Sequence, residues 1–245
     1  MADELELRLD RSDSFGSPGY EDFEISSVLT EAQSLFVKKF ISPLNNRKLE
    51  GFEETEIRNQ GLSALVKRGA SLTVSANQTD ILLNGKFFDL PSDFMYTIHE
   101  EAEINKSICN TNTKIIAEIK VVAHNELTRL VNNKYKKPYY KDYGKARVWR
   151  VEFSRTVDGV DPSSPATAKR HQLITDGTFN INRYSINYLK NPDDIIVDRS
   201  VSSNQRNCIL DESVHMTILD IATDLMMNRV KEQKVQNIEG IKDLE

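Results

Sequence analysis

The chain has 245 residues, of which 39% are hydrophobic and 28% are charged, and its formal net charge is −5. This balance is typical of a globular protein with one large or two small domains, and no stretch approaches the roughly 20 apolar residues of a membrane-spanning helix. The negative net charge argues against broad binding of nucleic acid phosphates, which requires clustered Lys and Arg.

The N-terminal segment has the alternating pattern of a β-strand. Leu5, Leu7 and Leu9 fall on one face, and charged residues fall on the other. A Gly/Ser/Pro-rich linker follows at residues 12–19, and the sequence offers no adjacent partner strand. We therefore predict that residues 1–20 form an extended arm. The arm either adds a strand to a neighbouring subunit through the three leucines, or it is disordered or pairs internally.

Two helices are predicted after the arm. From Glu21 the apolar residues, among them Leu29 and Phe36, follow i, i+3, i+4 spacing as far as Pro43. A second pattern from about residue 53 to 68 includes Leu65, ends in basic residues and is followed by a glycine suited to a helix C-terminus. We expect these two helices to pack as an antiparallel pair.

The section beyond residue 70 is rich in β signals. Asn84-Gly85 is typical of a tight turn, and it predicts a hairpin over residues 81–88. Further strands are predicted where β-branched and aromatic residues cluster, and the first two of them should pair: 95–104, 114–122, 146–153 and 179–189. A short helix is expected at 126–132 and a surface loop at 158–167.

The helical period returns near the C-terminus. Asp211 is placed to cap a long helix whose apolar stripe includes Ile218, Ile221 and Leu225. Beyond Lys231 the apolar residues continue at three-residue intervals, as Ile238, Ile241 and Leu244. These last three residues predict either a tail that docks on a neighbouring subunit or a frayed helix end.

The order of these segments predicts an α+β fold. Its helical core would combine the two N-terminal helices with the long C-terminal helix, and the β-rich section would be an insertion. The corresponding domain prediction is an extended N-terminal arm at 1–20, a helical core at 21–70 and 205–234, a β-rich insertion at 71–204, and a C-terminal tail at 235–245.

The sequence contains no complete catalytic or cofactor motif. The ten glycines form neither a phosphate loop nor a dinucleotide fingerprint, and no Gly-x-Ser-x-Gly elbow is present. Glu212 and His215 have the Glu-x-x-His spacing of di-iron bundles, but a bundle needs a second such pair. The other histidines, His99, His124 and His171, stand in no matching context. We therefore predict a protein that is not an enzyme and has no cofactor or metal.

Two further features bear on compartment and partners. Cys109 and Cys208 are far apart without Cys-x-x-Cys spacing, which indicates two reduced thiols. The basic, tyrosine-rich run at 132–141 resembles surfaces that hold single-stranded nucleic acid, or it is a polar loop that leads into a strand. The acidic N-terminus lacks the basic start and apolar run of a secretory signal, so we expect synthesis in the cytoplasm.

Several short segments stand in a characteristic order: 24–37, 51–66, Leu90-Pro-Ser-Asp-Phe-Met-Tyr96, 133–138, 186–196 and 208–222. The most specific of them are Tyr-Leu-Lys-Asn-Pro at 188–192 and Leu-Asp-Glu-Ser-Val-His at 210–215. In these segments, over roughly residues 21–232, the chain resembles the head-to-tail connector ring proteins of crAss-like phages, a group related in plan to the adaptor and tail-tube A proteins of podoviruses.

The resemblance implies a structural role without catalytic residues. It implies a dodecameric ring beneath the portal, or beneath another ring, with a central channel through which double-stranded DNA passes. The partners would be copies of the chain, the portal protein and adjacent rings, and the location would be the virion, after assembly in the host bacterial cytoplasm. The alternatives are a tail terminator or middle tail ring protein or, in a different class, a cytosolic nucleic-acid-handling enzyme.

Overall fold

The structure is a computed structural model that divides into two compact units. Unit 1 comprises Met1–Leu65 and Pro192–Glu245, and unit 2 comprises Val66–Asn191. The residues that the structure describes are 1–12, 20–41, 56–75, 82–108, 111–133, 135–141, 145–154 and 169–242. The predicted linker, except for Ser12, the predicted loop at 158–167, Cys109 and Leu244 lie outside the described residues.

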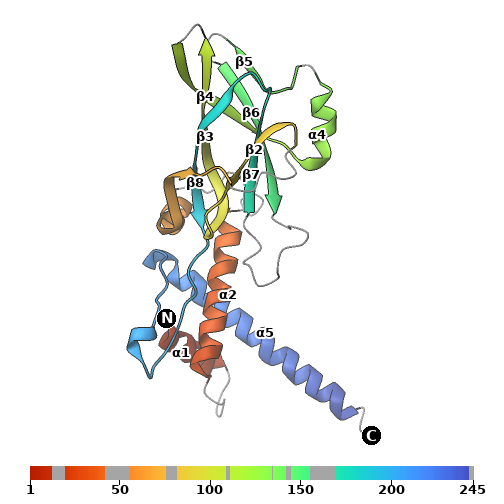
Figure 1. Ribbon diagram of the computed structural model, residues 1–245. Helices are drawn as coiled ribbons and strands as arrows, with labels where there is room; N and C mark the ends of the chain where they lie inside the picture. The colour runs from red at the N-terminus through yellow and green to blue at the C-terminus, as the bar shows by residue number, and fades with distance from the viewer. Residues whose placement is uncertain are drawn as a thin grey trace. The chain divides into compact units, whose positions relative to one another are not determined.

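Unit 1 is helical (Figure 1). Its α-helices are α1 (Ala2–Ser12), α2 (Asp22–Ile41), α3 (Glu56–Leu62) and α5 (His215–Lys242). Short 3₁₀ turns precede or follow them: η3 (Ser63–Leu65), η4 (Ser202–Asn204) and η5 (Glu212–Val214). No helix within the described ranges is both long and apolar enough to cross a bilayer.

The core of unit 1 forms where α5 packs against α2 and α1. The stripe of α2 buries Ile25, Val28, Leu29, Ala32 and Phe36 completely, as i, i+3, i+4 spacing requires. Across from it, α5 buries Ile218, Leu219, Ala222 and Met226. The predictions of a helix from residue 21 and of a long C-terminal helix are confirmed. Asp211 caps η5 as expected, because its carboxylate accepts a hydrogen bond from the Ser213 amide at 3.0 Å.

The N-terminal segment is a helix, so the predicted extended arm is wrong in its conformation. In α1, Leu5 and Leu9 are four residues apart and both are buried, whereas Leu7 is 53% exposed. Leucines four residues apart, at positions 5 and 9, lie on one face of a helix as well as on one face of a strand. The acidic residues of the first turn also suit the positive end of the helix dipole. Packing of the two buried leucines therefore decides for the helix.

The second predicted helix is much shorter than expected. α3 ends at Leu62, and the chain turns through η3 into the strand that begins at Val66. The predicted helix-terminal residues Lys67 and Arg68 are consequently in a strand. Gly69 has a positive φ of 67°, but it occupies an irregularity in strand pairing rather than a helix end.

Unit 2 is built on one eight-stranded sheet and a short helix, α4 (His124–Val131). The strands are β1 (Val66–Leu72), β2 (Asn84–Asp89), β3 (Phe94–Ile108), β4 (Thr111–Val121), β5 (Tyr139–Lys141), β6 (Lys145–Ser154), β7 (Lys169–Thr175) and β8 (Asn180–Lys190). Their order is β1-β8-β3-β4-β6-β7-β2, and β5 pairs with β6 off this path. Pairing is antiparallel except between β4 and β6, so the sheet is mixed.

The sheet is curled (Figure 1), and the chain after β1 links its two outermost strands. Val74 forms a β-bridge with Phe88 of β2, and the Ser75 amide donates to the Phe87 carbonyl at 2.8 Å. One face carries the larger apolar cluster, which includes Ala102, Val148, Leu173, Tyr184 and Ile186. The opposite face of β6 and β7 is covered by α4, whose Leu127 and Leu130 pack with Trp149, Val151 and Ile174.

Strand predictions based on local pairing are confirmed, and one based on a turn motif is wrong. β3 and β4 form the expected antiparallel pair, and the strands expected at 146–153 and 179–189 and the helix at 126–132 are present. Asn84-Gly85, however, begins β2 instead of turning a hairpin, and β2 pairs with β7. Gly85 is needed there for space, because a Cβ atom would lie 2.3 Å from the Gln172 amide nitrogen.

The predicted fold class, a helical core with a β-rich insertion, is wrong. The dominant element is a curled mixed sheet of eight strands, and the helices other than α2 and α5 are short. The expectation failed because the sheet depends on pairings between distant segments, such as β1 with β8 and β4 with β6. Local patterns predict strands, but they do not show that separate strands join into one sheet.

Candidate functional site

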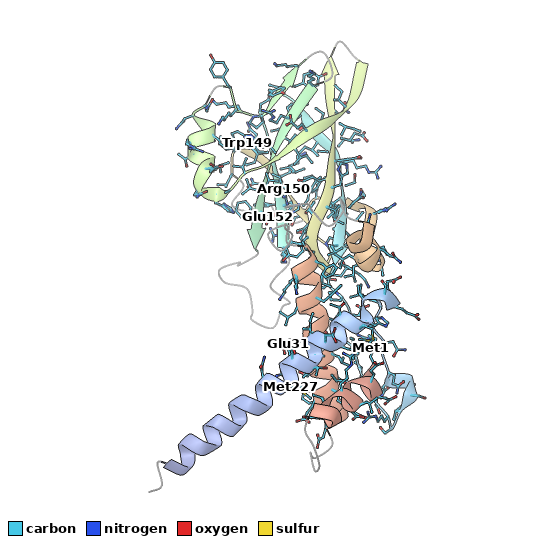
Figure 2. All side chains as sticks on the ribbon, turned by 180° about the vertical axis from the view of Figure 1, so that it is seen from behind. Met1, Glu31, Trp149, Arg150, Glu152 and Met227 are labelled. Carbon is cyan, nitrogen blue, oxygen red and sulfur yellow. The ribbon has the colours of Figure 1, made fainter. Side chains whose placement is uncertain are left out.

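The most chemically elaborate cluster in the described residues is a buried polar cycle in unit 2. Its members are Glu100 of β3, Arg150 of β6, His171 of β7 and Tyr184 of β8. Because side chains alternate along a strand, all four project from the face that carries the larger apolar cluster. Figure 2 shows Trp149, Arg150 and Glu152 along β6.

The cycle closes through three hydrogen bonds and one ion pair. Arg150 Nη1 donates to His171 Nε2 at 2.7 Å, and His171 Nδ1 donates to the Tyr184 hydroxyl at 2.7 Å. The Tyr184 hydroxyl donates to Glu100 Oε2 at 2.7 Å. Glu100 Oε1 lies 3.1 Å from Arg150 Nε, an ion-pair distance without the alignment of a hydrogen bond. The Arg150 guanidinium cannot release a proton, so His171 must carry its proton on Nδ1.

Burial sets the protonation of this cycle. Burial, reinforced by the Arg150 charge, lowers the pKa of His171 from its ordinary 6.5 to about 3, so the ring is neutral. Burial raises the pKa of Glu100, although Arg150 and the Tyr184 hydrogen bond oppose the shift. Burial and the adjacent Glu100 carboxylate raise the pKa of Tyr184. The three hydrogen bonds and the ion pair tie β3, β6, β7 and β8 together.

In unit 1, polar side chains of α2 hold an extended segment at residues 193–197. Thr30 Oγ1 accepts from the Ile195 amide at 3.0 Å, and Ser26 Oγ accepts from the Val197 amide at 2.8 Å. One turn further along, Gln33 Nε2 donates to the Asp193 carbonyl at 3.0 Å. Side chains three or four residues apart on α2 thus bond the backbone of every second residue of the extended segment. This side-chain ladder fixes a segment that forms one β-bridge to another described residue, between Ile196 and Arg206.

Ion pairs connect the acidic starts of α1 and α2 to other parts of unit 1. Arg199 lies between the two helices, with its guanidinium 2.7 Å from Glu6 and 3.3 Å from Asp22. Arg8 of α1 lies 2.6 Å from Asp220 of α5. These contacts and the burial of Leu5 and Leu9 place α1 on the body of unit 1. Its predicted contact with a neighbouring subunit stays a prediction, and Leu7 is the exposed leucine of the set.

The residues predicted for the helical core differ in burial. Leu29, Phe36, Leu65 and Ile218 are completely buried. Ile221 and Leu225 are only partly buried, because the buried stripe of α5 runs instead through Leu219, Ala222 and Met226. Ile238 and Ile241 belong to the backbone of α5, which continues as a helix to Lys242. The docking role predicted for them and for Leu244 stays a prediction.

The Glu-x-x-His pair has structural contacts. His215 Nε2 donates to the Leu210 carbonyl at 3.0 Å, and Glu212 lies in η5 immediately before α5. Cys208, Glu212 and His215 line one groove of unit 1. Burial raises the pKa of the Cys208 thiol. In the part of the chain that the structure describes, no group of three or more His, Cys, Asp or Glu side chains is arranged to hold a metal ion.

The basic tyrosine-rich run forms an exposed turn followed by β5. Tyr135, Lys136 and Lys137 are exposed in the turn, whereas Pro138 is buried. The Lys141 and Arg147 cations lie 5.2 Å and 5.3 Å from the centre of the Tyr139 ring. Arg147 also forms a forked ion pair with Glu118, with a shortest N–O distance of 2.9 Å. The turn at residues 135–137 is therefore an exposed part of this run.

Comparison with known proteins identifies the family. A family model described as phage tail ring protein 3/4 matches residues 1–237. The chain belongs to the phage tail ring protein 3/4 family. The resemblance to ring proteins of crAss-like phages that the sequence indicated is thereby confirmed.

Two relatives of this phage tail ring protein come from Bacteroides phage crAss001. A protein named ring protein 4/5 is 26% identical over 236 residues, which cover 92% of this chain and 90% of the relative. A protein named ring protein 3 is 24% identical over 212 residues, which cover 84% of each. Both matches extend over most of the chain, and the family is one of structural proteins of the phage tail.

Sequence reasoning missed the buried polar cycle of this tail ring protein. Three of its four residues were never singled out, and His171 was noted only as a histidine without a matching context. The segment Lys-Arg-His-Gln-Leu-Ile-Thr of β7 has three consecutive polar residues that are all buried, namely Arg170, His171 and Gln172. Such a run gives no strand pattern, and its partners come from strands far along the chain.

Proposed function

We propose that this chain is a subunit of a ring in the head-to-tail connector of a bacteriophage, beneath the portal, where copies of it enclose a channel for the genome. The observation that carries the proposal is the family match over residues 1–237, which includes nearly all of both units. The names of the two crAss001 relatives, ring protein 4/5 and ring protein 3, support the ring. The connector position rests on the sequence resemblance.

The proposed ring is a dodecamer with portal or adjacent ring proteins as neighbours. Double-stranded DNA would pass through its lumen without being held, because a subunit with a net charge of −5 repels the phosphate backbone. Assembly would take place in the host bacterial cytoplasm, and the finished ring would reside in the virion. A tail terminator or a middle tail ring would share the family and differ in its neighbours.

The chain ends are proposed to contribute contacts between subunits. The helical backbone of α5 continues to Lys242, which favours helical docking of Ile238 and Ile241 over an extended tail. Leu7, exposed on α1, is the corresponding residue at the other end. Truncation after residue 234 and Leu7→Asp should each weaken ring or stack formation and leave the melting temperature of the monomer nearly unchanged.

Native mass spectrometry and negative-stain electron microscopy of the purified protein test the ring. We expect closed rings of uniform subunit number, and reconstruction of the virion should place the protein between portal and tail. Monomers at every accessible concentration, together with absence from the virion, would contradict the proposal. A stoichiometric metal bound by His215 would instead favour the enzyme hypothesis.

A further inference from the structure

The two units carry opposite formal charges. Unit 1 contains 24 Asp and Glu against 13 Lys and Arg, a net charge of −11, whereas unit 2 contains 13 against 19, a net charge of +6. Identical subunits with such a division attract one another when the basic unit of one copy meets the acidic unit of the next. Complementary potentials of this kind guide association and fix its direction.

In unit 2, a rigid turn presents a basic and aromatic surface. The turn at residues 135–137, here the Tyr135 turn, is anchored by the buried Trp149, whose indole Nε1 donates to the Lys136 carbonyl at 3.1 Å. Asn133 holds the turn from the other side, because its Oδ1 accepts from the Tyr135 amide at 3.0 Å. The Tyr135 side chain is nevertheless 88% exposed. A fixed backbone thus holds an aromatic ring and two lysines in solvent. Binding through this turn would cost little further backbone entropy.

In unit 1, a groove of about 640 Å³ combines exposed apolar side chains with carboxylates. Its apolar members include Phe23, 79% exposed, and Ile196, 37% exposed. Asp22, Asp194 and Asp198 line the same groove, here called the Phe23 groove. Hydrogen bonds from Ser200, Val201 and Asn204 lower the pKa of Asp198 to about 2, so its charge persists at all physiological pH values. The side-chain ladder from α2 to residues 193–197 holds one wall of the groove in place.

We propose that the Tyr135 turn of one copy docks in the Phe23 groove of the next copy. Tyr135 would cover Phe23 and Ile196, and Lys136 and Lys137 would face Asp194 and its neighbouring carboxylates. Exposed aromatic anchors surrounded by complementary charge are typical of interface hot spots. The contact joins different surfaces of the two copies, and such a heterologous contact closes into a ring when its rotation permits. This inference rests on the proposed function and names the contact within the ring.

The strand that follows the turn, β5, is less well suited to nucleic acid. Stacking of bases requires open aromatic faces among free cations. Here Tyr139 already packs against Lys141 and Arg147, and Arg147 is paired with Glu118. The acidic groove of another copy offers a protein surface of opposite charge, which favours a second copy over DNA.

Charge reversal with complementation tests the contact. Lys136→Glu/Lys137→Glu reverses the charge of the turn, and Asp194→Lys reverses a charge in the groove. All three residues are exposed, so both variants should fold, as circular dichroism would verify. Each variant alone should raise the dissociation constant for self-assembly at least about tenfold at low salt, as close charge pairs at interfaces do. An equimolar mixture should recover assembly, because each altered turn then meets an altered groove and each native turn a native groove. The triple variant should also recover it.

Matched controls carry the same charge changes outside the two surfaces. Lys67→Glu/Arg68→Glu on β1 and Asp224→Lys on α5 alter exposed residues of unit 2 and unit 1, and both should assemble as the wild type does. Undiminished assembly by the turn variant, or no recovery in the mixture, overturns the docking inference but leaves the ring proposal standing. DNA binding is measured with a 30-base-pair duplex, which has roughly three helical turns. If the turn variant assembled normally but lost binding to this duplex, the turn would be assigned to DNA instead. Absence of assembly by the wild type would overturn both proposals.

Discussion

The two units bury polar groups in different ways. In unit 2 the buried set includes an ion pair, Arg150 with Glu100, closed into a cycle by His171 and Tyr184. In unit 1 the corresponding groups are neutral, since Ser26 and Thr30 of α2 bond the backbone of an extended segment. Removing one member of a buried charged set leaves an uncompensated charge, whereas removing a hydroxyl leaves an unpaired amide. The sheet unit should therefore be the more sensitive to single polar substitutions.

Arg150→Met gives the largest expected effect. It leaves the Glu100 carboxylate buried without its cation, and loss of one partner of a buried pair costs about 3–5 kcal/mol. Chemical denaturation of the variant and the wild type measures the difference. Arg147→Met, three residues earlier in the same strand, breaks the more exposed pair with Glu118 and should cost about 0–1 kcal/mol. An equal decrease in the free energy of unfolding in the two variants would mean that burial of the Arg150 ion pair does not affect stability.

Ile218→Ala should be the next most damaging change, and it tests the apolar core of unit 1. Ile218 is completely buried, so truncation should cost about 2–5 kcal/mol in thermal or chemical unfolding. Leu225→Ala, on the same helix but only partly buried, should cost less. A larger loss for Leu225 than for Ile218 would show that the stripe assigned to α5 is rotated.

The stability of unit 2 should depend on pH through His171. Because the folded pKa is about 3 and the ordinary value is 6.5, the unfolded chain binds the proton more tightly. The stabilisation is therefore complete above pH 6.5 and is lost as the pH falls through this window towards 3. The raised pKa of Glu100 opposes this, because its contribution to stability increases as the pH falls.

The net loss between pH 7 and pH 4 should be roughly 1–3 kcal/mol, and denaturant titrations at several pH values would measure it. His171→Gln should flatten this part of the profile. A wild-type profile that is level from pH 7 to pH 4 would contradict a neutral, buried His171.

Thr30→Val probes the smaller polar contribution in unit 1. The substitution keeps the shape of the side chain but removes the acceptor of the Ile195 amide, at a cost of about 1–3 kcal/mol. Thr223→Val on α5 removes only a bond from the hydroxyl to the carbonyl of Leu219 in the same helix, and it should be nearly neutral. Equal melting temperatures for the two variants would mean that the ladder does not stabilise residues 193–197.

Elements defined by local interactions could be predicted from the sequence. The apolar stripe of α2 and the capped start before α5 depend on residues three or four positions apart, and β3 and β4 are consecutive and pair directly. The family resemblance was also readable, because it depends on the order of short motifs. In each case the information lies within one element or between neighbours.

Elements defined by distant partners could not be predicted. Asn84-Gly85 is a good turn motif, yet β2 pairs with a strand about ninety residues later, where only glycine leaves room for Gln172. The polar run of β7 is buried because distant residues supply its partners: Arg150 and Tyr184 for His171, Asp89 for Arg170, and the Leu82 carbonyl for Gln172. No property of that run by itself distinguishes it from a loop.

The sequence by itself determined the helical period of α2 and α5, the strands with strong β propensity and the family. Only the tertiary structure decided that Leu5 and Leu9 are helical, that eight strands form one curled sheet, and that an acidic groove and a basic turn exist. The physical reason is that a periodic pattern specifies which side of an element is buried. The surface that buries it is supplied by residues remote in the chain.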